Sequence, residues 1–181
     1  MIRGEVERSD MILTELMGYA RLSEGRVEKI DMKEELQGAI EEAFPPNHAF
    51  HIQLKKDLHE GLPPLMMQRA HLREIMVNLL VNAREAAGEN GIVQVSCRPS
   101  PQYAIELRVK DSGKGIPLDQ REQIFEAYFT TKKKGTGLGL AIVKQNTELY
   151  GGEIVVESEL GVGTEFILTF PTRVLLQENE S

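Results

Sequence analysis

The segment Asp111-Ser-Gly-Lys-Gly-Ile-Pro117 is followed a short distance later by Gly135-Thr-Gly-Leu-Gly-Leu140. The first glycine-rich turn opens with a single aspartate, and the second leads directly into a helical pattern. Glycine lacks a Cβ and tolerates positive φ, so such turns let the backbone approach a ligand closely. A helix that begins after glycines exposes N–H groups to an anion, and a carboxylate can accept a hydrogen bond from a purine amino group. Together the two turns predict a purine nucleotide pocket, with the base at one turn and the phosphates at the other.

Either turn taken alone could simply be a tight connection between two elements. A third element favours the nucleotide interpretation, because apolar residues spaced by three and four predict a long helix over residues 72–87. Along one edge of its apolar stripe lie Glu74, Asn78, Asn82 and Glu85. A polar seam between helices, or capping, would be a structural explanation. A metal and phosphate site would be the functional one, because Mg²⁺ prefers oxygen ligands and takes few of them from protein.

The composition argues against several classes of protein. The chain has 181 residues, 41% hydrophobic and 27% charged, as in a soluble globular domain. Its net charge of −7 argues against a nucleic-acid surface, which needs clustered Lys and Arg. No apolar run approaches the ~20 residues that span a bilayer, and residues 1–5 do not begin a signal peptide. We expect a cytoplasmic domain, whose parent could still be membrane-anchored. The single cysteine, Cys97, is expected in the core rather than as a nucleophile.

Hydrophobic periodicity predicts the other elements. Helices are expected at residues 5–24, 33–43 and 138–150, with a short helix at 118–126. Alternating patterns predict strands at 27–32, 49–54, 93–97 and 103–109, and a closing hairpin of strands at 154–157 and 166–170. Residues 127–137 read as a polar, lysine-bearing loop. Helices mixed with largely antiparallel strands predict an α+β fold in two layers.

Five segments, in this order, resemble the ATP-binding catalytic domain of histidine protein kinases, within the wider family shared by gyrase, the Hsp90 chaperone and MutL. Residues 74–83 match the family's asparagine box and residues 111–115 its first glycine box. The phenylalanine box, the second glycine box and the last turn are matched by residues 125–132, 135–140 and 161–166. The resemblance covers residues 30–172 and implies a two-layer α/β sandwich of the Bergerat type, with helices on one face of a mixed sheet.

The resemblance also implies roles for individual residues. Asp111 would accept a hydrogen bond from the adenine amino group, with Gly115 admitting the base and Thr164 supporting it through water. Asn78 would ligate Mg²⁺, and Asn82 would contact phosphates or ligand waters. The residues expected at the cofactor are Asn78, Asn82, Asp111, Gly113, Gly115, Ile116, Phe125, Thr131, Lys132, Gly135, Thr136, Gly137, Leu138, Gly139, Leu140 and Thr164.

Glu74 and Asn78 are the residues expected to take part in catalysis. Glu74 occupies the place where ATPases of the family keep a water-activating base, and in kinases its duty would be to orient the incoming nucleophile. Many members carry a lysine or arginine shortly after the second asparagine to touch phosphate. This chain has Arg84 and Glu85 there, which departs from the pattern.

The N-terminal segment supports the kinase branch of the family. The helix expected at residues 5–24 resembles the second helix of a dimerisation and phosphoacceptor hairpin. We therefore expect residues 1–26 to be part of that hairpin, 27–175 to be the catalytic ATP-binding domain, and 176–181 to be a tail. His59, with Glu60 and Pro63 after it, imitates an acceptor motif, but consecutive prolines would disrupt an acceptor helix.

The implied function is that of a two-component sensor histidine kinase, which transfers the γ-phosphoryl group of ATP to a histidine outside this fragment. ATP and Mg²⁺ would be its cofactors. Its partners would be the histidine-bearing acceptor helix of the parent kinase, a response regulator, and a second copy of the parent in a homodimer. No nucleic-acid partner is expected. Residues 129–138 would form a mobile lid that orders around nucleotide.

Three other functions stay open on the sequence. A stand-alone ATPase of the same fold would use Glu74 to activate water. A serine kinase of the anti-sigma type would share the pocket but not the N-terminal helix. A non-enzymatic interaction module could keep the pocket as a relic, although packing alone does not require its asparagines, aspartate and glycines together.

Overall fold

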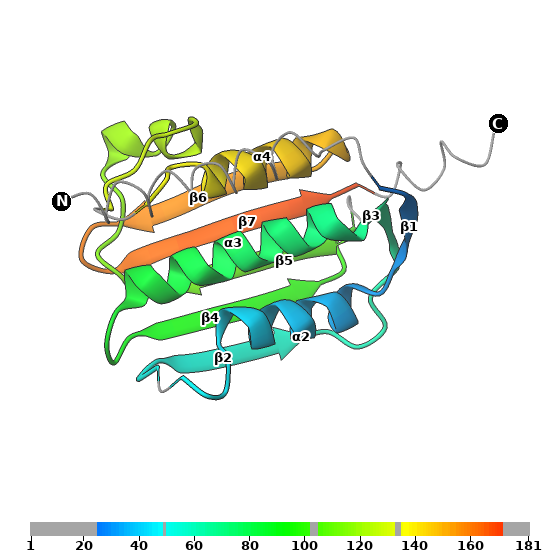
Figure 1. Cartoon of the computed structure of the whole chain (residues 1–181), viewed down its shortest axis with the longest axis horizontal. Coiled ribbons are helices and arrows are strands. Elements are labelled where there is room, and N and C mark those ends of the chain that lie inside the picture. Colours follow the sequence, from blue (N-terminus) through cyan, green and yellow to red (C-terminus); the bar gives the residue numbers. More distant parts are fainter. Residues whose placement is uncertain (1–24, 49, 102–104, 133–134, 172–181) are drawn as a thin grey trace, which may run out of the picture.

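A five-stranded sheet carries three α-helices on one face in the part of the chain that the structure, a computed structural model, describes: residues 25–48, 50–101, 105–132 and 135–171 (Figure 1). The strand order is β2(Gln53–Leu58), β4(Ile92–Arg98), β5(Ile105–Asp111), β7(Gly163–Phe170) and β6(Glu153–Glu159). Only β2 and β4 run parallel among these neighbours. The two-layer α/β sandwich with a mixed, largely antiparallel sheet is therefore confirmed.

A second, two-stranded sheet lies beside the main one. In it β1(Val27–Ile30) pairs antiparallel with β3(Leu65–Gln68). The helices are α2(Met32–Ala43), α3(Arg69–Ala87) and α4(Gly139–Leu149), and α3 lies between the other two (Figure 1). This order places α3 across the middle of the sheet, where one helix can reach both the turn after β5 and the start of α4.

The core lies between α3 and the inward faces of β4, β5 and β7. Alternation on each strand sends every second side chain to this layer, and each large apolar side chain stabilises the fold by ~1.5–3 kcal/mol when fully buried. Cys97 lies in this core, as expected, and burial raises the pKa of its thiol to about 12. The core members of these four elements are Leu72, Ile75, Met76, Leu79, Leu80, Ala83, Val93, Val95, Cys97, Ile105, Leu107, Val109, Phe166, Leu168 and Phe170.

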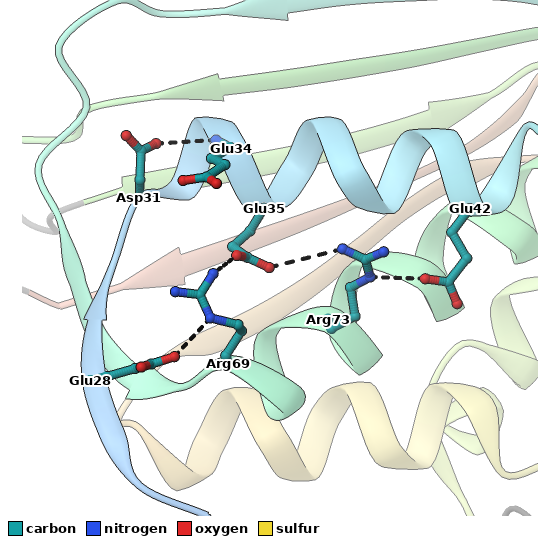
Figure 2. A network of polar contacts seen from close by, with 7 residues as sticks. All are labelled: Glu28, Asp31, Glu34, Glu35, Glu42, Arg69 and Arg73. Atoms are coloured by element: carbon teal, nitrogen blue, oxygen red, sulfur yellow. Dashed lines mark hydrogen bonds and ion pairs between the residues drawn. The ribbon is translucent and has the colours of Figure 1, made fainter.

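An ionic network joins α2 to the first turns of α3 (Figure 2). Glu35 on α2 is only 6% exposed and forms an ion pair with Arg69, with Arg73 at 4.0 Å on its other side. Arg69 also pairs with Glu28 of β1 at 2.7 Å, and Arg73 with Glu42 of α2 at 2.8 Å. The network thus ties β1, α2 and α3 together and extends from β1 to the last turn of α2.

The N-terminus of α2 has a side-chain cap. Asp31 accepts hydrogen bonds from the backbone N–H groups of Lys33 and Glu34 at 2.9 and 3.1 Å (Figure 2 draws the second). The cap satisfies donors that have no partner within the helix.

Two predicted boundaries were wrong. The strand expected at residues 49–54 begins at Gln53 instead, because its partner β4 begins at Ile92, opposite Gln53. Residues 118–126 form two separate 3₁₀ turns, Leu118–Gln120 and Gln123–Phe125, rather than one helix. Leu118 is 77% exposed, so this segment lacks the buried stripe that would stabilise a longer helix.

The sequence analysis missed one strand, and two of its predicted segments lie outside the residues that the structure describes. β3 follows Pro63 and Pro64 directly and is only four residues long, so its alternation was too brief to read. The helix expected at residues 5–24, and the part of the strand prediction that covers residues 103–104, lie outside the described residues.

Candidate nucleotide-binding site

A cavity of about 660 Å³ opens between α3, the turn after β5, the described residues 129–132 and 135–138 of the lid segment, and the start of α4. This volume is in the range of small-molecule sites. Segments far apart in the sequence therefore meet at one place, as the two glycine-rich turns predicted. The predicted cofactor residues that line it are Asn78, Asn82, Asp111, Gly115, Ile116, Thr131, Lys132, Gly135, Thr136, Gly137, Gly139, Leu140 and Thr164.

Asp111 sits in the wall of the cavity at the end of β5 and is 3% exposed. Its Oδ1 accepts a hydrogen bond from the Gly113 N–H at 2.8 Å, which fixes the carboxylate in a tight turn. Burial raises the pKa of Asp111, while hydrogen bonds from the Gly113 and Thr164 backbone and the charge of Lys132 act in the lowering direction. A buried carboxylate in such a wall can select a ligand that brings a hydrogen-bond donor.

Ser158 fastens the turn after β5 to the β6–β7 hairpin. Its hydroxyl shares a 2.8 Å hydrogen bond with the Thr164 hydroxyl and accepts another from the Ile116 N–H at 2.8 Å. Gly115 lies in this turn with φ +78°, and a Cβ there would come within 2.2 Å of the Glu159 carbonyl oxygen. The sequence analysis explained the glycine at position 115 by the close approach of a base. The close contact with the Glu159 backbone is a second reason for a glycine here.

The other end of the cavity is polar and lies along α3. Asn78 donates from Nδ2 to the Glu74 carbonyl at 2.8 Å, and its Oδ1 lies where a Cβ on Gly139 would come within 2.8 Å. Asn82 accepts a hydrogen bond from Lys132 of the lid segment at 3.0 Å, and Lys132 also forms an ion pair with Glu85. Oxygen ligands and a flexible cationic side chain thus face the same space, which suits a phosphate chain with a hard divalent ion.

Four predicted site residues stand outside the cavity wall. Gly113 packs against the carbonyl of Ala86, where a Cβ would come within 2.5 Å. Phe125 packs edge-on against the Phe166 ring with centroids 6.2 Å apart, and Leu138 is buried.

Glu74 is the fourth, and it lies one helical turn before Asn78 on α3. Its carboxylate accepts a hydrogen bond from Asn146 Nδ2 of α4 at 2.9 Å. The sequence predicted that Glu74, Asn78, Asn82 and Glu85 lie along one edge of the helix. Asn78, Asn82 and Glu85 line the cavity, whereas the Glu74 side chain faces α4.

The departure from the family pattern at residues 84 and 85 has a structural explanation. Arg84 donates to the carbonyl of Ala43, and its guanidinium lies 4.5 Å from the centre of the Phe50 ring. It therefore serves the contact between α3 and α2 rather than the cavity, whereas Glu85 lines the cavity and pairs with Lys132.

Sequence reasoning missed several residues of the site. The wall residues to which it gave no role are Val81, Ala86, Lys114, Pro117, Gln120, Ile124, Phe129, Thr130 and Leu160. Val81, Lys114, Phe129 and Thr130 lie within the predicted motifs, and the others lie close to one of them. Ser158 and Asn146 gave no signal, because each depends on an element far away in the sequence.

Comparison with known proteins identifies the family. The family described as histidine kinase-, DNA gyrase B- and HSP90-like ATPase matches residues 67–174, more than half of the chain. The chain belongs to this ATPase family. As a member it resembles the sensor histidine kinase ZraS of Escherichia coli (strain K12), 32% identical over 170 residues that cover 94% of this chain and 36% of ZraS. The chain thus spans about a third of the length of such curated relatives.

Solved structures of histidine kinases resemble this ATPase-family domain. The catalytic domain of histidine kinase ThkA has a TM-score of 0.73 and 29% identity, with 81% of this chain and 95% of that chain covered. Full-length ShkA in complex with AMPPNP has a TM-score of 0.76 and 30% identity, with 89% of this chain and 35% of that chain covered. The match therefore falls on the catalytic, ATP-binding part of sensor histidine kinases.

Two further observations concern the described residues of this ATPase-family domain. No helix among them has the length and apolar composition needed to cross a bilayer. Nor do three His, Cys, Asp or Glu side chains gather there as metal ligands.

Proposed function

We propose that this chain is the catalytic domain of a two-component sensor histidine kinase, and that it transfers the γ-phosphoryl group of ATP to a histidine outside this sequence. One observation carries the proposal: the cavity joins a buried carboxylate, Asp111, to a polar end formed by Asn78, Asn82 and Lys132. The likeness to ZraS, and to a kinase solved with AMPPNP, supports the same interpretation.

The residues divide the work of binding between the two ends of the cavity. Asp111 accepts a hydrogen bond from the adenine amino group, and Ile116 and Leu140 offer apolar surface to the base. The N-terminus of α4, which begins at Gly139, directs backbone N–H groups toward the phosphates. Lys132 leaves Asn82 and Glu85 to contact phosphate, so that the lid segment orders around the nucleotide.

Asn78 and Asn82 fit Mg²⁺, since they supply neutral oxygens beside a highly charged phosphate chain. We assign Asn78 as the ligand and Asn82 as a contact to phosphates or ligand waters. A bound Mg²⁺ would supply positive charge to the phosphate oxygens during phosphoryl transfer. Neutral amide ligands add no repulsion against the negative charge of those oxygens.

The remaining expectations are parts of the same proposal. Residues 1–26 would belong to the hairpin that brings two parent chains together, residues 27–175 to the catalytic domain, and residues 176–181 to a tail. The acceptor histidine would come from the parent's own hairpin, and a response regulator would receive the phosphate from it.

The test follows labelled γ-phosphate from MgATP, first with this chain alone and then with an added acceptor hairpin from ZraS. We expect the chain alone to bind nucleotide without releasing phosphate or labelling itself, and the added hairpin to acquire an acid-labile label. Rapid phosphate release by the chain alone would indicate instead an ATPase with Glu74 as base. Acid-labile label on His59 would show that this histidine is an acceptor despite the prolines that follow it.

A further inference from the structure

The charged side chains in the cavity wall balance one another among the residues that the structure describes. Two are carboxylates, Asp111 and Glu85, and two are ammonium groups, Lys114 and Lys132. The neighbouring arginine of α3, Arg84, is bound instead to the last residue of α2. This wall therefore has no excess of positive charge with which to attract a chain of phosphates.

Glu85 lies on the polar side of the cavity, beside the groups that would hold phosphate. Its Oε2 and the Oδ1 of Asn82 both contact the ammonium group of Lys132, at 2.5 and 3.0 Å. Asn82 follows Asn78 by one turn of α3, and the Asn78 Oδ1 lies beside Gly139 at the start of α4. The Glu85 carboxylate thus belongs to the row of polar side chains that runs along the cavity from the N-terminus of α4.

The ion pair between Lys132 and Glu85 is open to exchange. The two side chains are 40% and 45% exposed, so water and other ions compete with the pair. When Lys132 contacts phosphate, Glu85 loses its cation while further negative charge enters the same cavity. Repulsion between the carboxylate and the phosphate oxygens then disfavours the complex, unless a cation enters with the nucleotide.

We propose that Glu85 is a specificity-determining residue, whose charge makes the cavity select a nucleotide complexed with a divalent ion over the metal-free nucleotide. The inference rests on the proposed function and extends it to the form of the nucleotide that binds. Glu85 need not ligate the ion for this effect. Its charge raises the free energy of a bound metal-free phosphate chain more than that of the Mg²⁺ complex, because the ion cancels part of the phosphate charge.

The test is a calorimetric titration of AMPPNP in EDTA, of MgAMPPNP and of adenosine into the wild-type chain, Glu85→Gln and Glu85→Lys. The two variants form a charge series, and both new side chains suit an exposed helix position. Glu89→Gln and Glu89→Lys are the matched controls, because Glu89 is also exposed but lies outside the cavity wall. Chemical denaturation of each variant checks that the fold survives.

We expect Glu85→Gln to tighten the binding of metal-free AMPPNP by about fivefold or more, and Glu85→Lys to tighten it further. The gain of Glu85→Gln for MgAMPPNP should be about twofold or less, and the Kd for adenosine should not change, because adenosine has no phosphate to repel. The Glu89 variants should leave all three Kd values unchanged. Because salt screens charges that water can reach, the gain for metal-free AMPPNP should shrink as salt is added.

The outcomes separate this inference from the proposed function. A wild-type chain that binds neither MgAMPPNP nor adenosine would overturn the function itself. A wild-type chain that binds MgAMPPNP, together with Glu85 variants whose Kd values match those of the Glu89 variants, would overturn only the role of Glu85. So would a gain for MgAMPPNP or adenosine as large as the gain for metal-free AMPPNP.

Discussion

Asp111 is a carboxylate in an environment that disfavours its charge. Because burial raises its pKa, it takes up a proton at a higher pH than an exposed aspartate does. The ionised form therefore costs stability at neutral pH, and this cost disappears as the pH falls through the raised pKa. Retaining such a group in a cavity wall suggests selection for binding rather than for stability.

Acidification should weaken nucleotide binding through this group. As the pH falls through the raised pKa of Asp111, the carboxylate becomes a weaker acceptor for the adenine amino group, and the affinity for MgAMPPNP should fall. Calorimetry across the acid range, with Asp111→Asn measured in parallel, isolates this contribution from the titration of the phosphates. Parallel pH profiles for the two proteins would contradict the assignment.

Gly115 shows how a single side chain could close the site. An alanine there would bear both the cost of positive φ, ~1–2 kcal/mol, and a clash with the Glu159 carbonyl at 2.2 Å. We expect Gly115→Ala to lower the free energy of unfolding by more than the φ cost and to reduce MgAMPPNP affinity.

Gly161 provides the matched control, because it has φ +77° but no heavy atom within 4 Å of the place that a Cβ would take. Chemical denaturation of Gly161→Ala should show the φ cost alone. Equal losses in the two variants would mean that the contact at Gly115 is easily relieved.

At the scale of elements, the network of Figure 2 makes an asymmetric prediction. Glu35 is 6% exposed, whereas the side chain of Arg69 is 48% exposed. Removing the arginine leaves a buried charge with only the distant Arg73, while neutralising the glutamate leaves arginines that water can reach.

We therefore expect Arg69→Met to destabilise the domain by about 2 kcal/mol and Glu35→Gln by less than about 1 kcal/mol. Urea denaturation measures both. Arg98→Met is the control, because Arg98 pairs with Asp57 on an exposed surface and should contribute little. A larger loss in Glu35→Gln than in Arg69→Met would show that the arginines, not the glutamate, depend on the pairing.

At the scale of the whole molecule, the elements with strong periodicity were predictable. The long helix α3 and strands β4, β5 and β7 were placed correctly because each buries a regular stripe, which sequence alone displays. β3 and the start of β2 were not, since their extent is decided by partner strands. Residues 118–126 were misread as one helix because a short polar segment gives no periodic signal.

The residues of the candidate site were also predictable only in part. The sequence motifs correctly predicted that Asp111, Asn78 and the glycines of the second turn line one cavity. Long-range contacts could not be predicted, because the sequence does not state which helices are neighbours. The bond from Asn146 to Glu74 and the bridge from Lys132 to Glu85 are of this kind.

The most direct test of the nucleotide assignment is a calorimetric titration of MgAMPPNP and MgGMPPNP into the chain and into Asp111→Asn. The adenine amino group would donate to Asp111, whereas the guanine oxygen at the same position would repel it. We predict that the wild-type chain binds MgAMPPNP at least about tenfold more tightly than MgGMPPNP, and that Asp111→Asn loses tight binding while its fold survives. Equal affinities for the two nucleotides, or an unchanged affinity in Asp111→Asn, would contradict the account.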